Sequence, residues 1–170
     1  MITGKFIHAN STYIENLMRH RFVFDVSRFF LLLPVPETIT VLEAEVDNAG
    51  VDLVLVRKNV ARHIQMKTLS KNSTGNPYAV AEALDQIDGG CVIWMCYDRK
   101  SLKPTAYHFM GNRGSARMES LKAFDKCNKK KGGVRVERKG YRTVKSRDAK
   151  YQKLALNQLV SILFDLEQST

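Results

Sequence analysis

Hydrophobic side chains recur at three- and four-residue spacing through residues 11–33, which is the period of an amphipathic helix. The stripe consists of Ile14, Leu17, Met18, Phe22, Phe29, Phe30 and Leu33. At its start, Thr12 and Glu15 have the spacing of a capping box, in which two side chains satisfy backbone amides of the first turn. Pro34 and Pro36 follow the stripe, so we expect the helix to end there.

Three runs of mostly alternating apolar and polar residues follow at 39–46, 51–57 and 62–69, as expected of strands. Turn-forming residues separate them at 47–50 and 58–61, so the three runs predict an antiparallel meander. Helical spacing returns over 78–88, and the continuous apolar run at 91–97 is typical of a buried central strand. We expect a further strand at 105–110.

The C-terminal part of the chain has a less regular pattern. It predicts a helix over 115–127, a basic loop at 129–133, an edge hairpin at 134–144 and a helix over 148–167 that docks on the core. The whole order of elements predicts an α/β fold, with a mixed central β-sheet flanked by helices on both faces. At 170 residues, we expect a single domain, 1–170.

The composition is that of an ordinary globular chain, with 44% hydrophobic and 26% charged residues. No apolar run reaches the roughly 18 residues that span a bilayer, and the first residues lack the pattern of a secretory signal. The three cysteines have no metal-type spacing, which favours thiols in a reducing compartment. We therefore expect a cytoplasmic protein without a membrane partner.

The net charge of +10 is concentrated in one part of the chain. Residues 113–153 hold 15 Lys or Arg against 4 Asp or Glu, whereas the other residues hold 12 against 13. A basic segment of this kind, here 113–147, is either a solvated surface or a surface for a polyanion. A second, independent signal is needed to decide between the two.

That signal comes from the two runs at 51–57 and 62–69. If Arg57 opposes Arg62 across a tight turn, alternation places Asp52, Gln65 and Lys67 on one face of a hairpin. Glu45 would join them only if the preceding turn has one particular register, because a slip of one residue turns it to the other face. The place of Glu45 is therefore left open.

An acid, an amide and an ammonium group that meet in this way fit phosphodiester hydrolysis. Mg²⁺ prefers oxygen ligands, which the Asp52 carboxylate, the Gln65 amide and the Met66 backbone carbonyl would supply. A bound metal activates water for attack on phosphorus. Lys67 would orient that water or balance the negative charge of the transition state.

The spacing of Asp52 from Gln65-Met66-Lys67, behind a helix that carries Glu15, resembles the PD-(D/E)XK nuclease superfamily. It is closest to the Gln-x-Lys variant of Mrr-type restriction enzymes, and the resemblance covers about residues 11–110. It implies a restriction-endonuclease-like fold, a Mg²⁺ or Mn²⁺ cofactor and cleavage of DNA. It also implies a catalytic triad of Asp52, Gln65 and Lys67, with Glu15 as a further metal ligand if it is not a helix cap.

We therefore expect a metal-dependent DNA endonuclease, with RNA left open as a substrate. The basic residues expected to hold the nucleic acid are Arg113, Arg117, Lys129, Lys130, Lys131, Arg135, Arg138 and Lys139. Because one site cuts one strand, double-strand cleavage would need a homodimer. Val51 stands where the motif has proline, and Gln65 replaces its second acid. The alternative is thus a catalytically silent nuclease fold that binds nucleic acid or an acidic protein.

Overall fold

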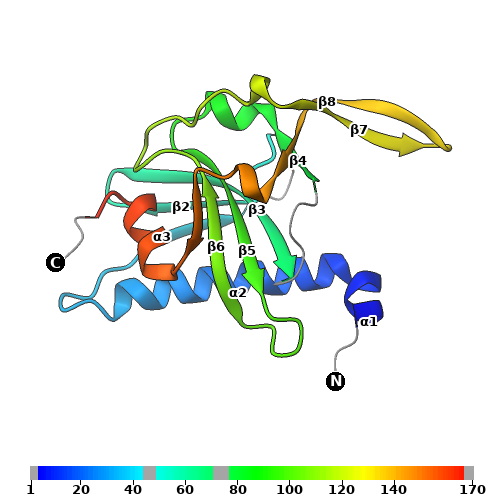
Figure 1. Ribbon diagram of the computed structural model, residues 1–170. Coiled ribbons are helices and arrows are strands. Elements are labelled where there is room, and N and C mark those ends of the chain that lie inside the picture. The colour runs from blue at the N-terminus through cyan, green and yellow to red at the C-terminus, as the bar shows by residue number, and fades with distance from the viewer. Residues whose placement is uncertain (1–3, 44–48, 71–76, 167–170) are drawn as a thin grey trace.

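The central feature of the computed structural model is a six-stranded sheet (Figure 1). The structure describes residues 4–43, 49–70 and 77–166. In sheet order the strands are β1 (Thr40–Glu43), β2 (Leu53–Arg57), β3 (Val60–Ser70), β5 (Gly90–Tyr97), β6 (Pro104–Met110) and β9 (Tyr151–Leu154). Strands β3 and β5 are parallel, and the other neighbours are antiparallel. The predicted α/β class with a mixed sheet is confirmed.

The remaining elements surround this sheet. The helices are α1 (Gly4–Ala9), α2 (Ser11–Leu31) and α3 (Leu156–Leu163), and the short 3-10 helices are η1 (Glu82–Gln86), η2 (Leu121–Ala123) and η3 (Ser146–Asp148). A second, three-stranded sheet contains β4 (Pro77–Ala81), β8 (Val134–Lys145) and β7 (Asp125–Lys131), in that order. Among the described residues, no helix is both long and apolar enough to cross a membrane.

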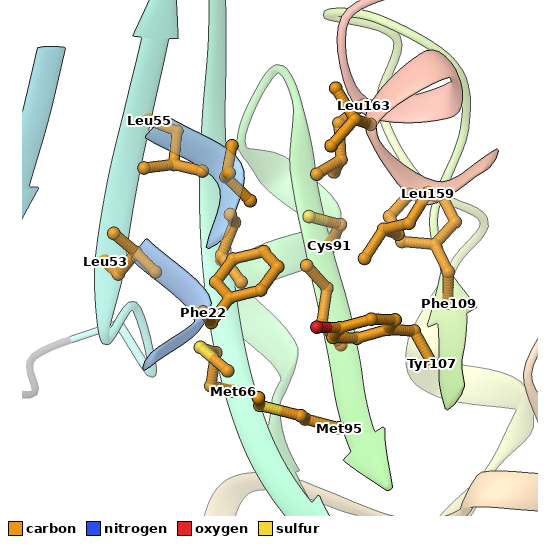
Figure 2. Close-up of a cluster of buried hydrophobic side chains, with 14 of the residues drawn as sticks. Phe22, Leu53, Leu55, Met66, Cys91, Met95, Tyr107, Phe109, Leu159 and Leu163 are labelled. Atoms are coloured by element: carbon orange, nitrogen blue, oxygen red, sulfur yellow. The ribbon is translucent and has the colours of Figure 1, made fainter. Parts of the chain in front are cut away.

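Helices α2 and α3 pack on the same face of the central sheet. Figure 2 shows Phe22 of α2 and Leu159 of α3 among side chains from β2, β5 and β6. Alternate residues of β5, which begin with Cys91 and Ile93, belong to this core. The apolar stripe predicted for residues 11–33 thus packs on the core as expected. The helix ends at Leu31, two residues before the predicted end.

The opposite face of the sheet is covered by the second sheet and the 3-10 helices. Val80, Leu84 and Leu121 pack there against Val92 and Trp94 of β5. Strand β5 is therefore buried on both faces, as its continuous apolar run predicts. The expected arrangement of helices on both faces is not confirmed.

Three predicted helices are wrong in whole or in part. Residues 78–88 form β4 and η1, and residues 115–127 contain η2 and the start of β7. The predicted helix over 148–167 is limited to α3, because η3 and β9 occupy the residues before it. Strands β4 and β9 pair with partners that are distant in sequence, and β7 pairs with β8 in a hairpin; this pairing overrides the local helical spacing.

The β2–β3 hairpin has a tighter turn than predicted. Arg57 pairs with Val60 rather than opposing Arg62, and Lys58 adopts a left-handed φ of 53° in the two-residue connection. The register is thereby shifted by two residues. Because side chains alternate with a period of two, this shift does not change the face of the hairpin that alternation assigns to Gln65 and Lys67, but Asp52 no longer opposes Lys67.

Candidate active site

A pocket of about 80 Å³ lies between the first turns of α2 and the far half of β3. It is lined by Glu15, Asn16, Arg19, Asp52, Met66, Lys67 and Thr68. Ile14 and Met18 are buried in the core beneath α2, and they fix the helix turn that carries the first three of these residues. The pocket therefore joins segments that are separated by more than thirty residues in the sequence.

The Asp52 carboxylate is held against the edge of β3. The last pair between β2 and β3 joins Leu53 to Ile64, and β3 then continues beyond it along β5. Asp52 binds β3 just past this last pair. Its amide donates to the Ile64 carbonyl at 2.9 Å, and its Oδ2 accepts from the Met66 amide at 2.7 Å. A carboxylate bound to a backbone amide is fixed in position before any ligand arrives.

Glu15 lies in the pocket and is not a helix cap. The helix begins at Ser11 with Asn10 in the capping position, so the predicted capping box of Thr12 and Glu15 is wrong. The Glu15 side chain is exposed and lines the pocket together with Asp52. The structure thus removes the competing role for Glu15.

Gln65 has a different environment from Asp52 and Lys67. Its side chain is only 2% exposed, and its Oε1 accepts a hydrogen bond from the Ala81 amide of β4 at 3.2 Å. It is not among the residues that line the pocket. Gly50 makes room for this contact, because a Cβ there would come within 2.9 Å of Gln65 Nε2 and collide with Ala81. Gln65 thus joins the two sheets.

Two cationic side chains complete the pocket. Lys67, from β3, is partly exposed there, and Arg19 enters from α2 one helical turn after Glu15. The Nη2 of Arg19 donates to Asn16 Oδ1 at 3.0 Å, whereas its buried Nε has no hydrogen-bond partner within the described chain. The pocket therefore combines two carboxylates with two cations.

Tyr78 contacts the backbone of Thr68, one of the residues that line the pocket. Its hydroxyl donates to the Thr68 carbonyl at 3.3 Å, and burial, reinforced by the charge of Glu15, raises the pKa of Tyr78 to about 12. The phenol therefore remains a neutral donor at physiological pH. Sequence reasoning did not find Tyr78, Asn16 or Arg19. Only Arg19 had a visible signal, since it lies four residues after Glu15 on the same helix face.

The predicted nucleic-acid-binding residues divide into two groups. Arg113 pairs with Asp165 at 2.8 Å and Arg117 pairs with Asp88 at 2.6 Å, so both guanidinium groups have partners on the body of the protein. The other group belongs to the β7–β8 hairpin and consists of Lys129, Lys130, Lys131, Arg135, Arg138 and Lys139. Glu45 lies outside the described residues.

No family model, curated protein or solved structure matches this chain. The functional assignment consequently depends on the chemistry of the pocket and of the basic hairpin.

Proposed function

We propose that the protein is a Mg²⁺-dependent phosphodiesterase that cleaves DNA at the pocket of Glu15, Asp52 and Lys67. One observation carries this proposal. Two carboxylates and two cations, drawn from a helix and from two neighbouring segments of the sheet, line a single small pocket. Carboxylates attract a metal ion and cations attract phosphate, and a phosphodiesterase needs both in one place.

The donor set fits a hydrated magnesium ion. Mg²⁺ is commonly bound by one or two carboxylates, while water and substrate phosphates supply its other ligands. Glu15 and Asp52 provide the two carboxylates, and the Met66 carbonyl is the proposed third ligand. Within the described residues, no three His, Cys, Asp or Glu side chains gather as a metal cluster, so the protein itself would supply few ligands.

Each residue of the pocket has a role in the proposed reaction. The Met66 amide holds Asp52, so the carboxylate needs no rearrangement to meet a cation. Lys67 would stabilise the negative charge that builds on the phosphate, and the Arg19 guanidinium would add a second positive charge beside it. A bound Mg²⁺ supplies the lowered pKa of the attacking water.

The order of elements supports a relation to the PD-(D/E)XK superfamily and a restriction-endonuclease-like fold. Helix α2 precedes the β1–β2–β3 meander, and a crossover then leads to β5, which is parallel to β3. The Asp52 and Gln-x-Lys positions lie on this meander. The departure is Gln65, whose oxygen bonds to Ala81. We therefore assign the acid chemistry to Asp52 and Glu15.

The proposal includes three further points about the substrate and the setting. We propose DNA rather than RNA as the substrate on the family resemblance. Cleavage of both strands would require a homodimer, because the pocket of Glu15, Asp52 and Lys67 would cut one strand at a time. A cytoplasmic location is supported by Cys91, Cys96 and Cys127, which are all thiols in the structure.

Plasmid nicking in Mg²⁺ or Mn²⁺ tests the proposal. Asp52→Asn keeps an oxygen that can accept from Met66 but removes the charge, and Lys67→Ala removes the cation. We expect each to lower the nicking rate by about 100-fold or more, which corresponds to roughly 3 kcal/mol of transition-state stabilisation. Glu119→Gln and Lys100→Ala, at exposed positions away from the pocket, should nick like the wild type. Equal nicking by all five proteins would remove the proposal.

A catalytically silent module is the second candidate, and the burial of Gln65 favours it. If Gln65 serves only to join the sheets, the pocket lacks one ligand of the family motif. This candidate predicts salt-sensitive DNA binding without metal and no cleavage. If nucleic acid fails to bind at low salt, an acidic protein becomes the partner to seek.

A further inference from the structure

The β7–β8 hairpin extends away from the body of the protein as a two-stranded ribbon (Figure 1). Residues 125–145 contain nine Lys or Arg and two Asp or Glu, so this segment carries a net charge of +7. The whole chain carries +10. Most of the excess positive charge of the protein therefore lies on one projecting ribbon. A ribbon of this shape can insert into a ligand, which a flat charged surface cannot do.

Apolar side chains accompany the charges near the end of the ribbon. Val134 is 65% exposed and Val136 is 41% exposed. They lie two residues apart on β8 and therefore on one face, and Val136 pairs with Lys129 across the ribbon. Exposed valines beside a lysine suit a ligand that is negative at its edges and apolar between them.

The base of the ribbon is fixed to the body. The second half of β8 pairs with β4, from Ala81 with Tyr141 to Pro77 with Lys145. Arg142 forms an ion pair with Glu82 at 2.8 Å and donates to the Phe124 carbonyl at 3.2 Å. A ribbon with a fixed base and an exposed end can enter a groove without losing much conformational freedom.

We propose that the β7–β8 hairpin is an arm that binds duplex DNA by entering the major groove. The B-DNA major groove is about 12 Å wide and admits a two-stranded ribbon. In that position Val134 and Val136 meet base edges such as thymine methyl groups. Lys129 beside them, and the long side chains of Arg135 and Lys139 from the other face of the ribbon, reach the flanking phosphates. The inference rests on the proposed function only in taking a nucleic acid as the partner, and it does not require the pocket to cleave.

The same features argue against other nucleic acids. The major groove of A-form RNA is too narrow for side chains to read, and an inserted ribbon would be wider still. Single strands are bound through aromatic platforms on which bases stack. Residues 125–145 contain one aromatic residue, Tyr141, and the Arg138 guanidinium already covers its ring at 3.6 Å. Duplex DNA is the form that this arm fits.

Binding of the full-length protein to a 20-base-pair DNA duplex, measured with EDTA present, tests the arm separately from cleavage. The arm variant is Lys129→Ala/Arg135→Ala/Lys139→Ala, and the matched control is Arg99→Ala/Lys100→Ala/Lys103→Ala, which removes the same charge from the β5–β6 loop. We expect the arm variant to bind about 10-fold or more weakly and its salt slope to fall by about 2 to 3. The control should lose much less affinity.

Further arms of the experiment identify the groove. Val134→Ser/Val136→Ser removes the exposed methyl groups without changing the charge, and it should lower affinity several-fold without changing the salt slope. Methyl green, which occupies the major groove, should compete with the protein, whereas a minor-groove ligand should not. Duplex RNA and single-stranded DNA of the same sequence should bind more weakly than duplex DNA.

Several results would contradict the proposal that the hairpin is a DNA-binding arm. Equal binding by the arm variant and its control would do so, as would equal affinity for duplex RNA or competition from the minor groove alone. A protein that binds through the arm but never nicks DNA would keep this inference and remove the proposed nuclease. If the arm variant binds and nicks DNA like the wild type, the proposed nuclease is kept and the DNA-binding arm is removed.

Discussion

At the scale of single residues, Asp85 joins the short helices η1 and η2 on the face of the central sheet that the second sheet covers. Its carboxylate accepts from Gln86 Nε2 at 2.5 Å, from the Leu121 amide at 2.7 Å and from Ser120 Oγ at 3.2 Å. Burial alone would raise the pKa of Asp85, but these three hydrogen bonds outweigh it and hold the pKa below its ordinary value. The ionised side chain therefore stabilises the fold.

This environment predicts a specific loss on substitution. Asp85→Ala removes the acceptor of a buried amide and should lower the free energy of unfolding by about 1 to 3 kcal/mol at pH 7. Because the pKa is lowered in the folded state, the contribution of Asp85 is complete above about pH 4 and is lost as the pH falls through the folded pKa. Urea unfolding from pH 7 down to acid should therefore show the two proteins converging. A constant difference across that range would contradict this account, and Glu119→Ala serves as an exposed control.

The sequence was sufficient to place Gln65 and Lys67 on one face of a strand, because strand alternation is a local property that survives a register shift of two. It could not reveal what each of them contacts. Gln65 Oε1 meets Ala81, and that contact depends on the way in which a second sheet folds over the first. The sequence therefore predicted which strands carry Gln65 and Lys67, but not what each side chain contacts.

At the scale of elements, Gln65 couples the central sheet to the sheet that carries the arm. Its oxygen accepts from Ala81, and Ala81 in turn pairs with Tyr141 of β8. Gln65→Leu should leave the Ala81 amide without its acceptor and lower stability by about 1 to 3 kcal/mol. Hydrogen exchange provides the sharper measurement. The Ala81 amide should exchange at least about 10-fold faster, while the Met66 amide, which Asp52 holds, changes much less. Equal acceleration at both amides would indicate global destabilisation and contradict the local coupling.

The helix predictions failed for a reason that belongs to this scale. Val80 and Leu84 have helical spacing, but Pro77–Ala81 pairs with residues of β8 sixty or more positions later. A window of local sequence contains no signal for a partner at that distance. The buried strand at 91–97 was predictable because both of its faces are apolar, and that property is written in the strand itself.

At the scale of the whole molecule, stability and charge are located in different places. The two hydrophobic cores cover the two faces of the central sheet, and of the side chains that the structure describes between Lys129 and Val136, neither core contains any. That end of the ribbon carries Lys129, Lys130, Lys131 and Arg135 without an acid. The fold should therefore tolerate its loss, whereas binding of a polyanion should not.

A shortened hairpin tests this separation. Replacing residues 129–136 by Asn-Gly joins the paired residues Asn128 and Glu137 through a two-residue turn of the kind that hairpins favour. Because no core contact is removed and some charge repulsion is relieved, we expect the melting temperature to change by only about 3 °C or less. DNA affinity should fall about 10-fold or more. If the shortened protein melts many degrees lower, the ribbon supports the fold. A structural role would then explain the ribbon, and binding of a polyanion would not be needed to explain it.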